Sequence, residues 1–318
     1  MTFAASERTD PRLVTGAGFE LDTFRVEGFP RELSARLVSA GARAAAAPLA
    51  CARILRRRRP DVVLGGGGYV AGPMVLAAAL LRTPAAIMEA DAELGLANRL
   101  AAPLARRVFL AFPIAGLDGD KYAVVGRPIP AQSRPGDPEE ARARFDLPAG
   151  EPVLLVFGGS QGARRLNEEA LEAFAEAGPA VLHLTGTRDF EQLLARPRRA
   201  GYRLLPFVED FGLALAAADL VVARAGGSVW ELAAAGKPAL LVPYPHATAD
   251  HQTKNARYFE RAGGVVVVPE SELDLRRQVA ELLADPGRLA EMGEAMRRLA
   301  KPDAADRVAE ELIALAAA

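Results

Sequence analysis

Short apolar runs alternate with longer stretches of helix-forming residues along most of the chain. Runs such as Asp61–Leu64 (DVVL) and Pro152–Phe157 (PVLLVF) are typical of fully buried strands. The stretches between such runs include Glu32–Arg59 and Arg164–Ala177, which are rich in helix formers. Because strands that alternate with helices form parallel βαβ units, the pattern predicts an α/β fold with doubly wound parallel sheets.

The pattern breaks once, near the middle of the chain. Four prolines occur between Gly126 and Pro138 (GRPIPAQSRPGDP), a composition typical of an interdomain linker. The 318 residues are too many for one compact core and suit two domains. We therefore expect a first domain over residues 1–130, a linker with the first helix over 131–150, a second domain over 151–300 and a final helix over 301–318.

Composition and charge then exclude several classes of protein. The formal net charge is −1, which argues against bulk electrostatic binding of nucleic acid. The single cysteine, Cys51, excludes an internal disulfide framework. The longest apolar run, Met74–Leu81, is far shorter than the ~20 residues of a membrane span. The residues after Met1 do not have the pattern of a secretory signal.

Three glycine-rich turns each join a predicted strand to a predicted helix. They are GGGGY at Gly65–Tyr69, GGSQGA at Gly158–Ala163 and the RAGGSVWE segment at Arg224–Glu231. Glycines let the backbone approach a ligand closely, and free N–H groups at a helix start attract an anion such as phosphate. The turns match neither the Walker nor the GxGxxG pattern, and glycines also serve tight packing. Four consecutive glycines exceed the need of a turn and favour a ligand loop, and the two later turns suit a diphosphate.

Polar side chains near the last turn are candidate ligand contacts. Ser228 and Glu231 have the S-x-x-E spacing of a helix capping box, but the carboxylate also suits ribose hydroxyls. Gln252 and Asn255 are three apart on one face of a helix start, where their amides suit sugar hydroxyls. Asp250 is a candidate N-cap of the same helix.

Other polar or aromatic residues carry weaker signals. His246 and His251 are too few and too loosely placed for a metal site, so we predict no metal. His183 lies in the apolar run VLHL and Trp230 lies between apolar residues, so both are expected in the core. The run Arg56–Arg59 is either a solvated helix end or a contact for anionic lipid head groups or a diphosphate.

Six motifs taken together resemble the MurG family of peptidoglycan glycosyltransferases: GGGGYVAGP, GRPIP, FGGSQGARRLN, FVED, ADLVVARAGGSVWE and VPYPHATADHQTKNA. The resemblance runs from about Thr2 to the chain end and is strongest in the second half. It implies an α/β fold of the GT-B class, with two Rossmann-like domains facing a cleft and a C-terminal helix returning to the first. It also implies a peripheral protein at the cytoplasmic face of the membrane, working on an anionic membrane surface without a cofactor.

The implied reaction transfers N-acetylglucosamine from UDP-GlcNAc to undecaprenyl-diphosphate-linked muramyl pentapeptide. The 4-hydroxyl of this acceptor attacks the anomeric carbon with inversion, and helix ends and loop amides stabilise the departing UDP without a metal. The resemblance assigns the donor to Ser160, Gln161, Gly162, Val208, Gly227, Ser228, Glu231, Gln252, Asn255, Asp91 and Arg127, the acceptor diphosphate to Gly66, Gly67, Gly68 and Tyr69, and a catalytic role to Glu89.

The sequence departs from the family pattern at several of these positions. The family's HEQN segment reads MEAD, so Met88 replaces the histidine and Asp91 the asparagine, while Glu89 remains. The family's GNPVR becomes GRPIP, with Pro130 in place of the arginine and Arg127 as its expected substitute. The RAGGSVWE turn is one residue shorter than in the family.

The resemblance begins at what is the second strand of the family. The first strand and its GGTGGH loop have no counterpart, so we expect a gap in the first sheet with unpaired backbone on both sides. A mis-assigned start or a truncated chain is the expected cause. As written, the chain is expected to bind UDP-GlcNAc weakly and to transfer poorly, and an added upstream segment is expected to restore transfer.

Three alternatives to the implied activity stay open. One is another GT-B transferase acting on a diacylglycerol or a natural product, and another is a UDP-sugar 2-epimerase. The third is a catalytically impaired scaffold that binds a nucleotide sugar, which the absent histidine loop favours. The HQTKNA and GGGGY segments favour the transfer to the lipid-linked acceptor.

Overall fold

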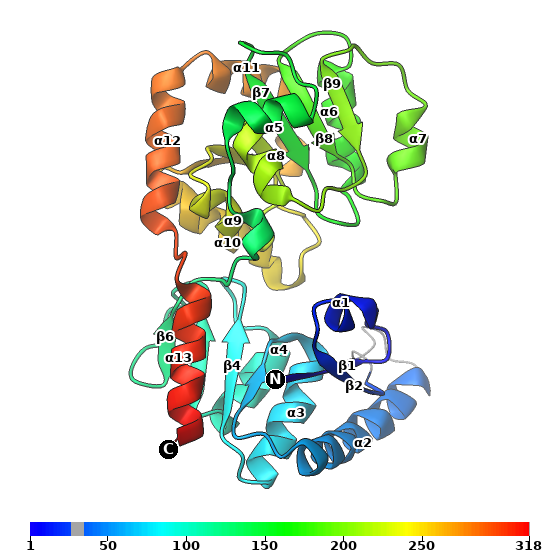
Figure 1. Cartoon of the computed structure of the whole chain (residues 1–318), viewed down its shortest axis with the longest axis vertical. Coiled ribbons are helices and arrows are strands. Elements are labelled where there is room, and N and C mark those ends of the chain that lie inside the picture. Colours follow the sequence, from blue (N-terminus) through cyan, green and yellow to red (C-terminus); the bar gives the residue numbers. More distant parts are fainter. Residues whose placement is uncertain (27–34, 318) are drawn as a thin grey trace. The chain divides into compact units, whose positions relative to one another are not determined.

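The computed structural model describes residues 1–26 and 35–317, and these form two compact units. The first unit comprises Met1–Val125 together with Asp306–Ala318, and the second comprises Gly126–Ala305. Figure 1 shows the elements of both units, each of which is described by itself. The final segment of the chain therefore belongs to the unit that contains the first strands.

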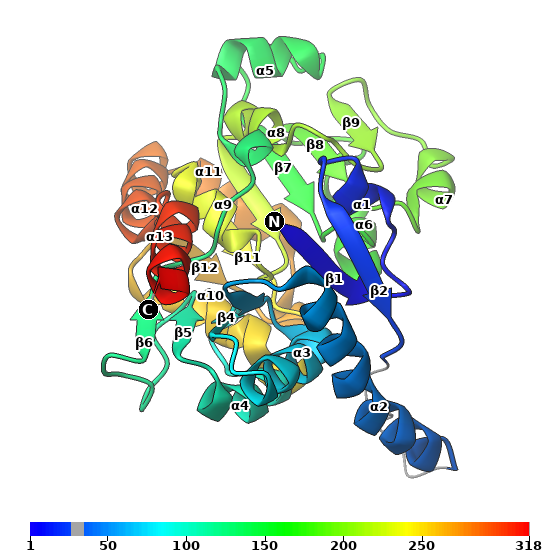
Figure 2. The same cartoon turned by 60° about the horizontal axis from the view of Figure 1, so that its bottom comes forward.

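The first unit contains two parallel sheets. The smaller consists of β1 and β2, paired from Thr2 with Glu20 to Ser6 with Phe24, and Figure 2 shows the two strands side by side. The larger has the order β3-β4-β5-β6. Among the described strands none joins β1 to β3, so the interruption expected from the sequence is present. The elements are β1 (Thr2–Ser6), α1 (Arg12–Thr15), β2 (Glu20–Phe24), α2 (Ala35–Arg58), β3 (Val63–Gly65), α3 (Gly68–Leu80), β4 (Ala85–Glu89), α4 (Leu96–Ala101), β5 (Arg107–Leu110), β6 (Tyr122–Val124) and α13 (Ala304–Ala317).

Ion pairs fasten the end of α2 to the small sheet. Both Arg57 and Arg58 contact the carboxylate of Asp22, at 2.6 and 2.8 Å, and Arg58 also contacts Glu20. The hydrogen bond from Arg58 lowers the pKa of Asp22, whose side chain is only 10% exposed. Both arginines therefore pair with carboxylates of β2, and the Arg57 side chain, 63% exposed, still lies at a solvated helix end. The expected helix started at 32, and residues 32–34 lie outside the described residues.

Helix α13 packs on the larger sheet of the first unit. Val308 is buried against Ala86, Phe109 and Val125, and Figure 1 shows α13 alongside this sheet. Arg107 on β5 adds an ion pair of 2.7 Å to Glu311. Burial of this apolar helix face stabilises the returning chain end in the first unit.

The second unit has one six-stranded parallel sheet in the order β12-β11-β10-β7-β8-β9. The order runs outward from β7 in both directions, which is the doubly wound arrangement expected from the strand–helix alternation. The elements are α5 (Pro138–Arg144), β7 (Val153–Phe157), α6 (Arg164–Phe174), β8 (Ala180–Leu184), α7 (Phe190–Leu194), β9 (Tyr202–Leu205), α8 (Phe211–Ala217), β10 (Leu220–Ala223), α9 (Val229–Ala234), β11 (Ala239–Leu241), α10 (His251–Arg261), β12 (Val265–Val267), α11 (Leu275–Leu283) and α12 (Pro286–Leu299), with short 3-10 turns at Ala131–Ser133, Thr248–Asp250 and Glu270–Glu272.

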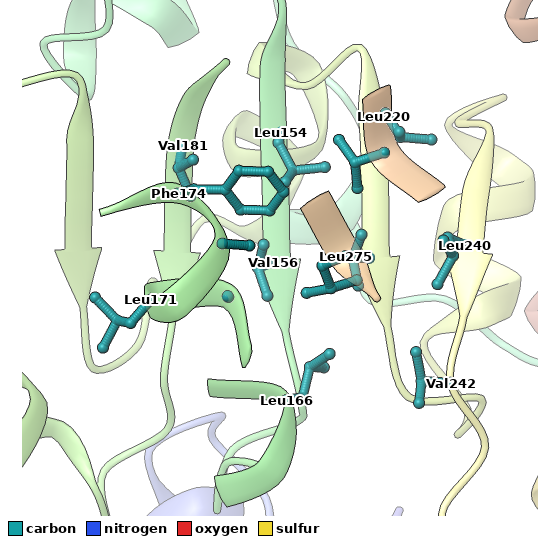
Figure 3. Packing of buried hydrophobic residues seen from close by; sticks show 14 of the residues in the cluster. Leu154, Val156, Leu166, Leu171, Phe174, Val181, Leu220, Leu240, Val242 and Leu275 are labelled. Atoms are coloured by element: carbon teal, nitrogen blue, oxygen red, sulfur yellow. The ribbon is translucent and has the colours of Figure 1, made fainter. Parts of the chain in front are cut away.

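A large cluster of the core of the second unit lies between this sheet and the helices on one of its faces. Figure 3 shows Phe174 of α6 between Leu154 and Val181 of neighbouring strands, and Leu275 of α11 in the same cluster. His183 is fully buried, as expected, and bonds the Tyr202 hydroxyl at 2.7 Å and Asn167 at 3.0 Å. Burial lowers the pKa of His183 to about 3, so the ring stays neutral at physiological pH. Trp230, 1% exposed, is a packing residue as expected.

Candidate functional site

The turn between β10 and α9 holds an arginine from the linker directly against its glycines. A Cβ placed on Gly227 would lie 2.1 Å from Nη1 and 2.2 Å from Cζ of Arg127. The guanidinium therefore occupies the space that any side chain at position 227 would take. A positive charge at a glycine turn with free backbone N–H groups is an arrangement that binds phosphate oxygens.

Glu231, one turn into α9, is held by a different partner from the one that its spacing suggests. Ser228 has φ −62° and ψ −13°, which is helical, and its side chain makes no capping hydrogen bond. Because an N-cap residue needs extended φ and ψ, the capping-box interpretation is wrong. The Ser133 hydroxyl donates instead to Glu231 Oε1, and Ser133 is only 2% exposed.

The turn after β7 is packed tightly on its inner side and open on its outer side. A Cβ on Gly162, whose φ is +78°, would lie 2.1 Å from the Thr185 carbonyl oxygen. Ser160 and Gln161 are exposed beside it. Helix α6 starts at once, and Ala163 at its N-cap makes no side-chain capping bond. Backbone N–H groups at the start of α6 therefore keep no side-chain acceptor and are available to an anion.

The loop from β11 to α10 carries the two amides singled out above. Gln252 accepts a hydrogen bond from the Tyr244 N–H at 2.9 Å through its side-chain oxygen. Asn255 is fully buried and donates to the Ala225 carbonyl at 3.2 Å. Asp250 stands at the N-cap of α10 without a side-chain capping bond. Gln252 thus lies at the surface of the loop, while Asn255 ties the loop to the neighbouring glycine turn.

These turns all follow the carboxyl ends of strands in one parallel sheet. They follow β7, β10 and β11, and Val208, partly buried, follows β9. In open α/β sheets this edge is where ligands bind. The second unit thus gathers Ser160, Gln161, Gly162, Val208, Gly227, Ser228, Glu231, Gln252 and Arg127 at one edge, with Asn255 behind them.

In the first unit the glycine loop leads directly into α3. Gly67 and Gly68 have φ of +91° and +67°, conformations that favour glycine, and no side chain caps the helix. Gly66 lies beside them and Tyr69 is 43% exposed. An uncapped helix start with glycines around it leaves its N–H groups accessible to an anion.

The loop between β4 and α4 is folded around Glu89. The Oε1 atom of Glu89 accepts hydrogen bonds from the N–H groups of Ala90 and Asp91 at 3.0 and 3.2 Å. Its Oε2 accepts from the Gly95 N–H and the Asn98 side chain, both at 2.9 Å. A Cβ on Gly67 would lie 3.5 Å from the Met88 carbonyl oxygen of β4 and 3.6 Å from that Asn98 amide of α4, so the glycine loop lies against both elements. Glu89 is 6% exposed, and all of its acceptor positions are used within the protein.

Sequence reasoning missed Ser133 and Asn98, which hold the two carboxylates in place. Ser133 contacts a carboxylate 98 positions away, and Asn98 contacts its carboxylate across an irregular loop. Neither residue is marked by the periodic pattern of apolar and polar positions in the sequence. Within residues 1–26 and 35–317, no group of three His, Cys, Asp or Glu side chains is placed to share a metal ion.

Comparisons with known proteins bear on both units. The N-terminal domain model of glycosyltransferase family 28 matches residues 2–110, and the C-terminal domain model matches residues 153–308. A UDP-N-acetylglucosamine–N-acetylmuramyl-(pentapeptide) pyrophosphoryl-undecaprenol N-acetylglucosamine transferase from Halorhodospira halophila is 45% identical, over 94% of this chain and 85% of its own length. A protein of the same description from Rubrobacter xylanophilus is 40% identical, over 98% of this chain and 94% of its own.

Solved structures give the same picture. The crystal structure of Acinetobacter baumannii MurG has a TM-score of 0.74 and 28% identity, covering 98% of this chain and 90% of that one. A UDP-GlcNAc 2-epimerase from Neisseria meningitidis has a TM-score of 0.63 at 15% identity, covering 98% of this chain and 100% of that one, a likeness of fold alone. The parallel sheets of the two units and these neighbours confirm the GT-B fold class. The chain belongs to glycosyltransferase family 28, among the MurG enzymes.

Proposed function

We propose that this chain transfers N-acetylglucosamine from UDP-GlcNAc to the 4-hydroxyl of undecaprenyl-diphosphate-linked muramyl pentapeptide. The observation that carries the proposal is the single sheet edge of the second unit. An arginine and a carboxylate lie at the turn between β10 and α9, an amide lies at the loop between β11 and α10, and the uncapped start of α6 follows β7 at the same edge. These groups match the diphosphate, ribose and sugar of the donor in turn. The relatives carry this activity in their descriptions.

In the proposed reaction the acceptor oxygen forms a bond to the anomeric carbon as the bond from that carbon to the UDP oxygen breaks. The configuration inverts, the hydroxyl proton leaves the acceptor, and UDP departs with the bonding electron pair. Arg127 and the N–H groups at the start of α6 stabilise the negative charge on the diphosphate without a metal ion. The glycine loop of the first unit, Gly66–Tyr69, is proposed to hold the diphosphate of the acceptor.

A UDP-release assay tests the proposal. The chain is incubated with UDP-GlcNAc, with and without a lipid I analogue, and the products are separated. UDP release that depends on the analogue, with a disaccharide product, is the expected result. Formation of UDP-N-acetylmannosamine without acceptor would instead identify an epimerase, and binding of UDP-GlcNAc with no turnover would identify a scaffold.

Glu89 is proposed to act as a positioning residue. Its four internal hydrogen bonds shape the loop that carries Asp91 and the start of α4. A carboxylate whose acceptor positions are all occupied gains a proton only by losing one of those bonds. The donor contact expected for Asp91 stays a prediction, as do the other residue roles.

Replacing Ser133 by alanine is expected to weaken UDP binding, because the hydroxyl orients the Glu231 carboxylate toward the ribose. Loss of one hydrogen bond of ~1 kcal/mol corresponds to roughly a fivefold rise in Kd. Calorimetry with UDP and with 2′,3′-dideoxy-UDP measures the effect. The analogue lacks the ribose hydroxyls, so its affinity should not change.

Ser271→Ala, an exposed serine in the same unit, is the matched control and should bind both ligands like the wild type. Equal weakening of both ligands by Ser133→Ala would show that the serine does not act through the ribose. Unchanged affinity of Glu231→Ala for UDP-GlcNAc would remove Glu231 from the site.

We further propose that helices α3 and α4 place the first unit on an anionic membrane surface. Leu76 and Leu80 are exposed one turn apart on α3, and Leu96 and Leu100 are exposed one turn apart on α4. The two helices are in contact, and Figure 2 shows them together. No helix within the described residues is long and apolar enough to span a bilayer. These exposed apolar side chains, with the exposed Arg82 two residues after Leu80, suit attachment to the lipid interface.

The double variant Leu80→Ser with Leu100→Ser is expected to lose most of its sedimentation with anionic vesicles at low salt. Burial of each leucine contributes roughly 1.5–3 kcal/mol, so loss of both removes most of the attraction. The control is Leu194→Ser, a 42% exposed leucine of the second unit. Equal sedimentation of the three proteins, or no sedimentation of the wild type, would rule the proposal out.

A further inference from the structure

Arg224, the first residue of the RAGGSVWE segment, is buried and contacts several other residues. It is 8% exposed, although arginine is among the residues most often found at the surface. Its Nη1 donates to the carbonyl oxygens of Val242 and Pro243 at 3.1 and 3.2 Å. Its Nη2 pairs with the carboxylate of Glu270, just beyond β12. The Arg224 side chain therefore joins the carboxyl ends of three neighbouring strands, β10, β11 and β12.

The same guanidinium also contacts the next residue of the β11–α10 loop. It lies 5.5 Å from the centre of the Tyr244 ring, within the range of a cation–π contact. The Tyr244 N–H is the group that holds the side-chain oxygen of Gln252 at 2.9 Å. Arg224 thus contacts both Pro243 and Tyr244, the two residues whose shared peptide group contains the N–H that orients Gln252.

A second contact ties the opposite end of the loop to the same segment. Asn255, three residues after Gln252, donates to the carbonyl oxygen of Ala225 at 3.2 Å. Consecutive residues of the glycine turn, Arg224 and Ala225, therefore hold the two ends of the stretch from Val242 to Asn255. This stretch contains Gln252 but none of the residues placed at the uridine or the ribose.

We propose that Arg224 and Glu270 form a clamp that positions Gln252 for the sugar of the donor. Arg224 is a positioning residue, since its guanidinium bonds Val242, Pro243 and Glu270. Glu270 neutralises its charge, because a buried guanidinium without a carboxylate would be strongly unfavourable. The inference rests on the proposed function and deepens it: the clamp sets recognition of the sugar and leaves recognition of UDP to Arg127 and Glu231.

Calorimetry with two ligands tests the clamp. In Arg224→Lys the forked contacts to the carbonyls are lost, since lysine is a point charge. The affinity for UDP-GlcNAc should fall roughly tenfold, the size of one lost hydrogen bond to a sugar, while the affinity for UDP stays within twofold. Glu270→Gln keeps an acceptor oxygen without the charge and should give a smaller loss with the same selectivity.

Arg257→Lys is the matched control, because Arg257 lies on α10 and pairs with Glu260 of its own helix. It should bind both ligands as the wild type does. A parallel fall in both affinities, or no change in either, would overturn the clamp. Glu270→Gln keeps the test decisive if Arg224→Lys does not fold. A wild-type chain that binds UDP but gains nothing from the sugar would contradict the proposed function itself, a result distinct from a selective loss in the variants.

Discussion

Replacing Gly227 by alanine is expected to lower the affinity for UDP-GlcNAc by roughly a hundredfold, with little change in stability. The new Cβ would take the space of the Arg127 guanidinium, 2.1 Å from Nη1. Arg127 would have to leave the turn, with the loss of charge-assisted hydrogen bonds to the diphosphate worth about 1.5–3 kcal/mol each. The fold should persist, because the clash is with the flexible end of a side chain and Gly227 does not have a positive φ.

A double-mutant cycle separates this cause from direct obstruction of the ligand. Isothermal calorimetry with UDP-GlcNAc is applied to Gly227→Ala, Arg127→Ala and the double variant. If the alanine acts by displacing Arg127, the double variant binds like Arg127→Ala alone. Fully additive losses would show that the glycine is needed for backbone approach to the phosphate instead. Gly287→Ala, an exposed change in the same unit with only Asp285 at 3.4 Å, should bind like the wild type.

The sequence predicted the turns well because their signals are local. Each buried strand is followed at once by glycines and a helix start, and the structure has all three junctions. Topology then brings the turns of the second unit to one edge, which follows from parallel strands alone. The match to the family predicts a donor contact for Arg127, which stays a prediction, and the structure places the guanidinium against Gly227.

The partners of the charged side chains were beyond sequence reasoning. Ser133 is 98 positions before Glu231, and only the path of the linker brings the two together. The spacing of Ser228 and Glu231 predicted a capping box, but the spacing contains no information on the helical φ and ψ of Ser228. In the same way, nothing near Arg57 and Arg58 in the sequence indicates Asp22, which lies on a separate strand.

Replacing Glu89 by alanine is expected to unfold the loop after β4. The change leaves the N–H groups of Ala90, Asp91 and Gly95 and the Asn98 amide without their acceptor. The Asn98 amide keeps its bond to the Met88 carbonyl, and the three N–H groups are only partly buried or exposed, so water can replace the lost acceptor. At about 0.5–1.5 kcal/mol for each of the four lost hydrogen bonds, the free energy of opening this loop should fall by at least ~2 kcal/mol. Hydrogen exchange of the three backbone amides measures this directly and does not depend on two-state unfolding of the whole chain.

Glu89→Gln distinguishes a positioning residue from a general base. Glutamine presents an NH₂ group to one pair of donors, so two of the four contacts become donor against donor, and faster exchange of the facing amides is expected in addition to lower turnover. A base without a structural role would lose turnover in Glu89→Gln while its amides kept wild-type protection. Asp118→Ala removes an exposed carboxylate of the same unit and should change neither quantity. Asn98→Ala should reproduce part of the Glu89→Gln effect, because Asn98 supplies one of the four donors and also donates to the Met88 carbonyl at 3.0 Å.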